Sequence, residues 1–186
     1  MSVEEILFDV EEHMEKTIAK LRSDLAGIRT GRANPGLVDS LRVEVYGSPT
    51  PLKQIAAVSC PEPQQILIRP YDPGTMGAIE KAIQAADLGM NPQNDGKLIR
   101  LNVPALSAEV RRKMVTRIKE LAEESKVSLR NIRRDGNKKA DSAEKGKTIS
   151  EDQRDDAKKE IQDLIKKYEA KASNLAKDRE KEVLEA

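Results

Sequence analysis

Hydrophobic residues recur every three or four positions along the first thirty residues of the chain. This spacing places them on one face of an α-helix, which we expect to run from Ser2 to about Arg29. Ser2 and Glu5 have the spacing of a capping box, in which two side chains satisfy free backbone amides at the start of a helix. The predicted buried positions are Val3, Leu7, Val10, Met14, Ile18, Leu21, Leu25 and Ile28. Such a stripe predicts packing against other helices.

Two segments nearer the carboxyl end have the same spacing. One spans residues 107–147, and its first residue is a serine, a suitable N-cap. Gly136 falls inside this segment and costs about 1 kcal/mol relative to alanine, so the helix can kink or fray beyond it. The other segment spans residues 150–184, with capping-box spacing between its first residue and Gln153. The predicted buried positions are Val110, Met114, Ile118, Leu121, Leu129 and Ile132 in the first, and Ala157, Ile161, Leu164, Tyr168, Ala172, Leu175 and Val183 in the second.

Between these helices, short alternating segments and frequent prolines and glycines replace the helical spacing. We expect strands at 41–46, 54–59, 65–69 and 97–103, and one helix at about 75–88. Basic and acidic residues balance from residue 31 to 105, with seven of each, so this unit carries no strong nucleic-acid footprint. The pattern predicts a compact α+β unit.

Together these elements predict an α+β fold with two domains. No single helix stripe can bury itself, so we expect a long three-helix bundle made of residues 1–30 and 105–186. A smaller α+β domain, residues 31–104, is inserted after the first helix. The chain therefore crosses between the domains twice, and we expect a hinge at these crossings. The hinge residues are Thr30, Gly31, Pro104 and Ala105.

A row of basic residues follows the central helix. Arg130, Arg133 and Arg134 are three and four positions apart, so their side chains crowd one flank. Arg112, Lys119, Lys126 and Arg133 are each seven apart and extend this flank, because a helix drifts only about 20° per heptad. Guanidinium groups suit phosphate, so the row indicates a surface for a nucleic-acid backbone.

A charged stripe is also typical of a merely solvated helix face. The sign imbalance favours binding: residues 106–149 carry 13 basic and 7 acidic residues, whereas the rest of the chain carries 20 basic and 25 acidic ones. The formal net charge of +1 therefore conceals a polarised molecule. Aromatic residues make up only 2%, which argues against modules that stack bases on aromatic platforms.

Chemistry for catalysis is absent from the sequence. His13 is the single histidine and Cys60 the single cysteine, so neither a Ser/His/Asp set beyond His13 nor a cysteine-based zinc cluster can form. There is no phosphate-binding glycine loop, and the carboxylates alternate with lysines as in solvated ion pairs. We expect no enzymatic activity, no cofactor, no metal and no small-molecule substrate. No apolar run reaches the roughly 20 residues of a membrane span, and residues 1–9 do not have the features of a signal peptide, so we expect a soluble cytoplasmic protein with no membrane partner.

Four stretches carry a resemblance to a known family, and they span the chain. They are Ile28 to Pro35, Tyr46 to Leu52, Glu80 to Ile83 followed by Asp87 to Pro92, and Val127 to Asn137. With these stretches, the chain closely resembles the bacterial ribosome recycling factor family. Gly136 departs from the alanine that the family pattern leads us to expect at this position.

The resemblance implies an L-shaped, monomeric molecule of roughly tRNA size, in which the inserted domain is a β/α/β sandwich. It implies binding to the large ribosomal subunit after peptide release, and subunit splitting with elongation factor G and GTP. Family arginines that grip ribosomal RNA match Arg111, Arg130 and Arg133, and Arg29 and Arg32 match the hinge motif as further candidate contacts. The full set of candidate ribosome-binding residues is Arg111, Arg112, Lys126, Arg130, Asn131, Arg133, Arg134, Arg29 and Arg32.

Two other classes of function fit the basic row. A coiled-coil adaptor would place the row against an acidic protein and show no preference for ribosomes. A non-specific RNA- or DNA-binding protein would bind duplexes and ribosomes equally and would not depend on elongation factor G.

Overall fold

The computed structural model describes residues 1–185, which form two compact units. The first unit consists of residues 1–25 and 116–181. The second consists of residues 26–115 together with the chain from Glu182 onward. The domain boundaries predicted at 30/31 and 104/105 both lie within the second unit and stay a prediction. The predicted α+β class, with a helical bundle and a β/α/β region that follows the first helix, is confirmed.

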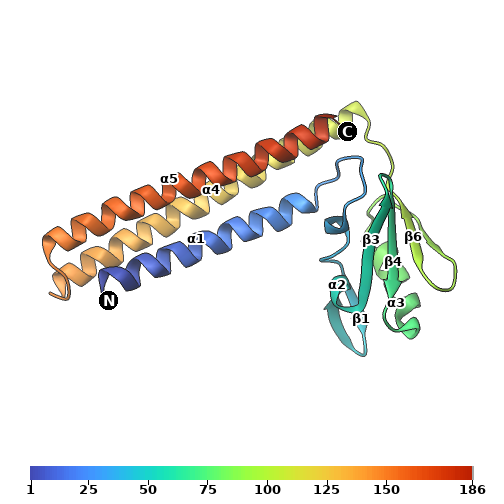
Figure 1. The fold of residues 1–186 in the computed structure, drawn as a ribbon, viewed down its shortest axis with the longest axis horizontal. Helices are drawn as coiled ribbons and strands as arrows, with labels where there is room; N and C mark the ends of the chain where they lie inside the picture. Colours follow the sequence, from blue (N-terminus) through green and yellow to red (C-terminus); the bar gives the residue numbers. More distant parts are fainter. Residues whose placement is uncertain (186) are drawn as a thin grey trace. The chain divides into compact units, whose positions relative to one another are not determined.

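The bundle is formed by α1 (Val3–Ala26), α4 (Ala108–Lys145) and α5 (Glu151–Glu185), which run side by side (Figure 1). Local side-chain caps fix where these helices begin. The Glu5 amide donates to Ser2 Oγ at 3.2 Å, the Val110 amide to Ser107 Oγ at 3.2 Å, and the Gln153 amide to Ser150 Oγ at 3.1 Å. The three predicted helix starts are therefore confirmed, because each cap satisfies an amide that the helix itself leaves free.

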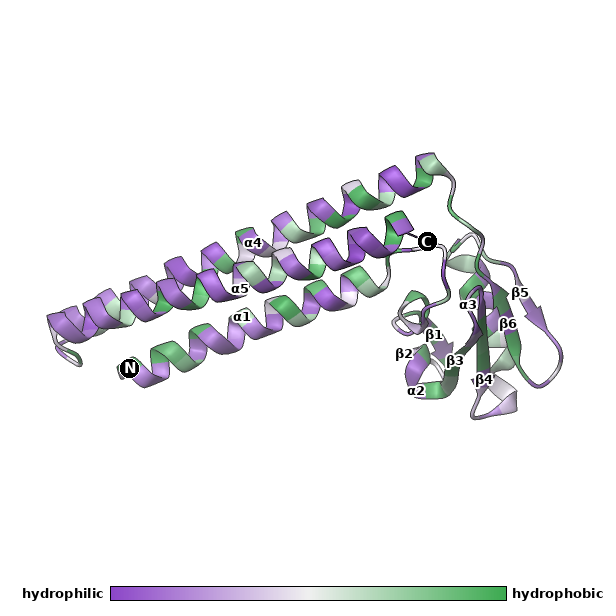
Figure 2. Cartoon of the chain, turned by 45° about the horizontal axis from the view of Figure 1, so that its top comes forward, coloured by the Kyte–Doolittle hydropathy of each residue, from purple (hydrophilic) through white to green (hydrophobic). Residues whose placement is uncertain are grey.

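Hydrophobic residues recur as bands along each bundle helix (Figure 2), and most predicted core positions are buried. Some predictions were wrong by one residue. Ile6 is buried and Leu7 only half-buried, and in α5 Ile165 and Ala176 are buried where Leu164 and Leu175 were expected. Adjacent residues lie about 100° apart on a helix, so two neighbouring apolar residues compete for one place in the core. Val3, Val110, Met114 and Ile132 are also half-buried rather than buried.

Gly136 lies in the bundle core, and α4 continues through it to Lys145. The sequence allowed a kink or fraying at Gly136, but the helix is continuous there. A Cβ atom on Gly136 would lie 2.6 Å from Val10 Cγ2 of α1 and 3.2 Å from Ile161 Cδ1 of α5. The glycine therefore lets three helices approach closely at one level, and this packing offsets its poor helix propensity.

Helix α1 ends at Ala26, three residues before the predicted end at Arg29. Two glycines explain the difference, because Gly27 is a poor helix former and Gly31 has a φ of +83°. The short 3₁₀ turn η1 (Pro35–Leu37) then packs against the end of the helix: a Cβ on Gly36 would lie 2.7 Å from Ala26 Cβ. The chain thus turns at the helix end and is held there by close packing.

Tyr168 is the largest fully buried side chain and connects α5 to α1. Its hydroxyl donates to Glu15 Oε1 at 2.5 Å and approaches Glu11 Oε1 at 3.4 Å, and Lys171 Nζ lies 4.7 Å from the ring centre. The hydrogen bond from Tyr168 lowers the pKa of Glu15, and burial followed by the same bond raises the pKa of Tyr168 above its ordinary value. The network is a charge-assisted link between two helices that are far apart in sequence.

We expect Tyr168→Phe to lower the free energy of unfolding by about 1 to 2 kcal/mol at neutral pH, because the ring stays and only the hydroxyl is lost. Glu15 has a lowered pKa in the folded protein, so the link contributes above the unfolded value of 4.5 and is lost as pH falls through the folded value. Urea unfolding of both proteins at neutral pH and at about pH 3 tests this. If the two proteins differ in free energy of unfolding as much at about pH 3 as at neutral pH, the role given to Glu15 is contradicted.

The second unit contains two sheets and two short helices between its strands. Strands β1 (Arg42–Val45) and β2 (Ser48–Pro51) form a hairpin. The larger antiparallel sheet has the order β3 (Ala56–Glu62), β4 (Gln65–Pro70), β6 (Ile99–Asn102) and β5 (Pro92–Asn94). Helix α3 (Met76–Ala85) follows the 3₁₀ turn η2 (Pro73–Thr75) and packs on β1. One core joins Val43 and Val45 of the hairpin to Ile66 and Ile68 of the sheet and to Ile79 and Ile83 of the helix.

Three of the four predicted strands are confirmed in place, as β1, β4 and β6. The strand predicted at 54–59 was partly wrong, because α2 (Leu52–Ile55) occupies its beginning and β3 starts only at Ala56. Strands β2 and β5 were not predicted. Both contain proline, which is depleted in strands and hides the pattern. Helix α3 ends at Ala85 instead of residue 88, before two residues of positive φ, Asp87 and Gly89.

Candidate nucleic-acid interface

The predicted basic row lies on α4, and helix geometry gathers it on one flank. Six basic residues fall within an arc of roughly 100° around the helix axis, on the side next to the core stripe. We call this set the basic ridge: Arg112, Lys119, Lys126, Arg130, Arg133 and Arg134. Three acidic residues of α4 lie in the same arc, Glu123, Asp141 and Glu144, and the last two lie beyond Arg134. The ridge is therefore positively charged along most of its length.

The outer part of the ridge combines exposed and half-buried groups. Arg134 is exposed, whereas Lys126 and Arg133 are half-buried, so their stems lie along the bundle and their charged heads reach solvent. Within residues 1–185, no acidic side chain forms an ion pair with any of these three residues. Their full charges are thus available to an external anion.

Arg130 differs from its neighbours because two acidic side chains hold it. Its Nη1 lies 3.4 Å from Glu123 Oε1 on the same helix, and its Nε lies 3.5 Å from Glu169 Oε1 on α5. Its side chain is 42% exposed. The two carboxylates orient the guanidinium and also compete with any phosphate that approaches it.

Asn131 and Arg111 lie on α4 outside the basic ridge, whereas Arg112 is the first residue of the ridge. Asn131 is exposed and points away from the ridge by about 100° of helix rotation relative to Arg130. Arg111 is half-buried, and the exposed Arg112 donates from Nε to the Ala108 carbonyl at 3.4 Å. Both arginines lie in the first turns of α4, in the part of the chain grouped with the second unit. The structure thus gathers Lys126, Arg130, Arg133 and Arg134, and places Asn131 on a neighbouring face.

Arg29 and Arg32 lie outside α4, in the loop after α1. Arg29 is half-buried, and its Nη1 donates to the Leu88 carbonyl at 3.5 Å. The same nitrogen is 2.9 Å from where a Cβ on Gly89 would stand, so the absence of a side chain there makes room for the guanidinium. Arg32 is exposed. Arg29 thus bonds to the loop that follows α3, and a role of either arginine in RNA contact stays a prediction.

The four predicted hinge residues lie in two loops. Thr30 is buried, and its Oγ1 accepts a hydrogen bond from the Arg32 amide at 3.4 Å, while Gly31 supplies the positive φ. Pro104 and Ala105 are exposed in the loop between β6 and α4. The first loop is therefore held by local contacts, and hinge motion stays a prediction.

Sequence reasoning missed three residues that shape the ridge: Glu123, Glu169 and Val127. Val127 is 45% exposed and lies with Glu120, Glu123 and Glu124 around a shallow hollow beside the ridge. Glu123 could have been found, because it precedes Arg130 by two turns on the same face. Glu169 could not, because its approach depends on how α5 packs against α4.

The described residues offer little for other chemistry. Within residues 1–185, no three His, Cys, Asp or Glu side chains gather as metal ligands, and no helix has both the length and the apolar composition to cross a membrane. Cys60 is half-buried, and burial followed by the charge of Asp39 raises the pKa of its thiol, so it is a poor nucleophile.

Comparison with known proteins gives a consistent result. A family model described as ribosome recycling factor matches residues 21–184. The ribosome-recycling factor of Rhodopirellula baltica is 71% identical over 140 residues, which are 75% of this chain and 75% of that protein. That of Bacillus subtilis is 44% identical over 181 residues, 97% of this chain and 98% of that protein.

Solved structures of similar proteins agree with these sequence matches. A solution structure of a ribosome recycling factor matches with a TM-score of 0.76 and 36% identity, over 100% of this chain and 99% of that one. A second structure concerns the T. thermophilus ribosome recycling factor and the E. coli elongation factor G bound to the E. coli post-termination complex. It matches with a TM-score of 0.68 and 41% identity, over 99% of this chain and 100% of that one.

Proposed function

Because this chain belongs to the ribosome recycling factor family, we propose that it binds the ribosome after peptide release and, with elongation factor G and GTP, separates the subunits for a new round of translation. The observation that carries the proposal is the match across nearly the whole chain to a recycling factor studied with elongation factor G on the post-termination complex. This protein is a translation factor and not an enzyme. GTP is hydrolysed by its partner.

The basic ridge is the proposed contact with ribosomal RNA of the large subunit. Lys126, Arg133 and Arg134 present charges with no acidic partner in the described chain, as a surface that meets phosphates requires. Such contacts read the backbone and the shape of a folded RNA, not its base sequence. The aromatic content of 2% fits this mode, because base stacking needs aromatic platforms. We further propose that the protein acts as a monomer in the cytoplasm.

The rival adaptor and non-specific binding hypotheses are tested by light scattering of purified post-termination ribosomes. We expect scattering to fall only when the protein, elongation factor G and GTP are all present, because separated subunits scatter less than whole ribosomes. Omitting each component in turn supplies the controls. If the protein binds ribosomes but does not split them when elongation factor G and GTP are both present, the proposed function is contradicted. Equal affinity for ribosomes and for duplex RNA would favour a non-specific nucleic-acid-binding protein.

Glu123→Gln is expected to raise ribosome affinity about two- to fivefold, because it removes one of the two ion pairs of Arg130, an exposed pair worth at most about 1 kcal/mol, and leaves only the pair with Glu169. The measurement is equilibrium binding to ribosomes at moderate salt. Glu160→Gln is a matched control, since it makes the same charge change at an exposed position of α5. An equal gain in both variants would show a general charge effect and would contradict a specific role of Arg130.

A further inference from the structure

The hairpin β1–β2 presents an unpaired backbone edge on β1. A two-residue turn at 46–47, with φ of 54° and 78°, joins the strands, and the Val45–Ser48 pair that closes such a turn exchanges hydrogen bonds. Hydrogen-bonded positions alternate along an antiparallel pair. The amide and carbonyl groups of Arg42 and Glu44 therefore point away from β2. Within residues 1–185, no strand pairs with this side of β1.

The outer edge of β2 is different because proline blocks it. Pro49 and Pro51 stand opposite Glu44 and Arg42 in the register, at the positions whose amides would face outward. Proline has no amide hydrogen, so this edge cannot accept another strand. The hairpin thus has one edge closed to strand pairing and one edge, on β1, with both hydrogen-bond donors and acceptors intact.

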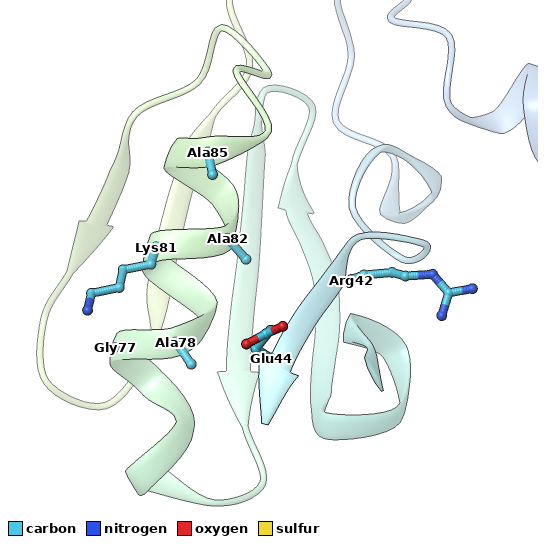
Figure 3. Close-up of a pocket in the computed structure, with 7 residues that line it drawn as sticks. All are labelled: Arg42, Glu44, Gly77, Ala78, Lys81, Ala82 and Ala85. Atoms are coloured by element: carbon cyan, nitrogen blue, oxygen red, sulfur yellow. The ribbon is translucent and has the colours of Figure 1, made fainter. Parts of the chain in front are cut away.

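A groove of about 580 Å³ runs beside the open edge, between β1 and α3. Arg42 and Glu44 line it from the strand, and Gly77, Ala78, Lys81, Ala82 and Ala85 line it from the helix. Figure 3 shows the alanine methyl groups directed toward the side on which β1 lies, whereas the Lys81 side chain points away from it. Small side chains on this face of α3 leave room along the strand, and a Cβ on Gly77 would meet nothing within 4 Å.

The charges that line this groove have no partners in the described part of the chain. Arg42, Glu44 and Lys81 are exposed and make no ion pair among residues 1–185. Arg42 and Glu44 are two residues apart, so they project from the same face of β1 with opposite signs. A strand laid against this edge would meet one cation and one anion in a fixed order.

We propose that β1 receives an extended segment of a partner protein as an additional antiparallel strand. The segment carries a basic residue opposite Glu44 and, two positions later, an acidic residue opposite Arg42, since directly opposed residues of opposite charge attract. The residue between them lies beside Val43, which shares a core with Ile79 and Ile83 of α3, so it faces the alanine side of the groove and is apolar. The backbone of the segment satisfies the free amides and carbonyls, as in other sheet-edge recognition. This site is independent of the basic ridge.

The test uses the full-length protein, isotope-labelled for NMR, and a blocked heptapeptide, acetyl-Thr-Val-Lys-Val-Glu-Val-Thr-amide. We expect saturable shift changes confined to β1 and to the groove side of α3. We also expect the exchange of the Arg42 and Glu44 amides with solvent to slow about tenfold when the peptide is at ten times its Kd. A peptide with Lys and Glu exchanged should bind at least about threefold more weakly, because it places like charges opposite each other.

Two variants separate strand addition from other contacts. Glu44→Pro removes one outward amide while leaving the bonds to β2, and it should abolish binding, whereas Glu44→Gln keeps the amide and should retain binding with less charge preference. Ala82→Gln fills the groove from the helix side and should also abolish binding. This second variant tests the proposal even if the proline variant does not fold. The absence of shift changes at millimolar peptide, or binding that survives both variants, would overturn the proposal. So would sedimentation showing that a second copy of the chain occupies the edge.

Discussion

Arg133→Glu is expected to weaken ribosome binding by about 10- to 100-fold at moderate salt. Arg133 makes no ion pair within residues 1–185, so its charge can be directed entirely at RNA. Reversal removes one phosphate contact and adds repulsion, and each contact of this kind is worth about 1 to 3 kcal/mol. The fold should be unaffected, because Arg133 bonds to no other element of the described chain.

The decisive measurement is the dissociation constant for ribosomes at several salt concentrations. The slope of log affinity against log salt should decrease by about one relative to the unsubstituted protein, as one counterion fewer is released. Lys159→Glu is the matched control, since it makes the same charge change at an exposed residue of α5 that has no ion pair in residues 1–185. If both variants lose affinity equally, net charge and not the ridge governs binding.

Gly136→Ala is expected to destabilise the bundle by about 1 to 2 kcal/mol, although alanine is the better helix former by about 1 kcal/mol. The new methyl group would stand 2.6 Å from Val10 Cγ2, and the β-branched Val10 is buried and stiff about χ1. Ile161 Cδ1, at 3.2 Å, is the end of a more flexible side chain and can yield. The cost of overpacking therefore exceeds the gain in propensity.

A double-mutant cycle with Val10→Ala tests this account through urea unfolding. Val10→Ala alone should destabilise by leaving a cavity, whereas the pair should be more stable than the sum of the two single changes by about 1 to 3 kcal/mol. Additive effects would show that the added methyl is accommodated by movement elsewhere. A more stable Gly136→Ala protein would show that the helices separate at little cost.

The sequence was sufficient to predict structure where that structure depends on residues close together in the chain. The capping pairs at Ser2 and Ser150 and the spacing of buried residues each act within a few residues, so the three long helices were found within a few residues of their ends. The pattern was insufficient where tertiary packing decides. Gly136 was interpreted as a weak point of α4, but it is a contact point of three helices, and only the positions of Val10 and Ile161 reveal this. Strand β2 was not predicted because it contains two prolines, which are rare in strands. Neither proline interrupts a hydrogen bond to β1, because both stand at positions whose amides would face outward.

The candidate site shows the same division. The spacing of Lys126, Arg133 and Arg134 along α4 follows from helix geometry alone. The ion pair between Arg130 and Glu169 depends on the neighbouring helix, and the bond from Arg29 to the Leu88 carbonyl joins residues 59 positions apart. Sequence spacing can therefore nominate charged groups, but it cannot distinguish those that are already engaged within the protein.

The bundle is assembled from segments that leave the translating ribosome at very different times. Helix α1 is complete at Ala26, whereas α5 ends only at Glu185. At about 5 to 20 residues per second, the buried face of α1 waits roughly 8 to 30 seconds for its last partner. Helices α4 and α5 follow each other directly and pair through local contacts that form fast. During this time the apolar stripe of the nascent α1 is exposed to other chains. Charged residues flank the stripe and reduce its tendency to aggregate; they include Glu11, Glu12, Lys16 and Lys20.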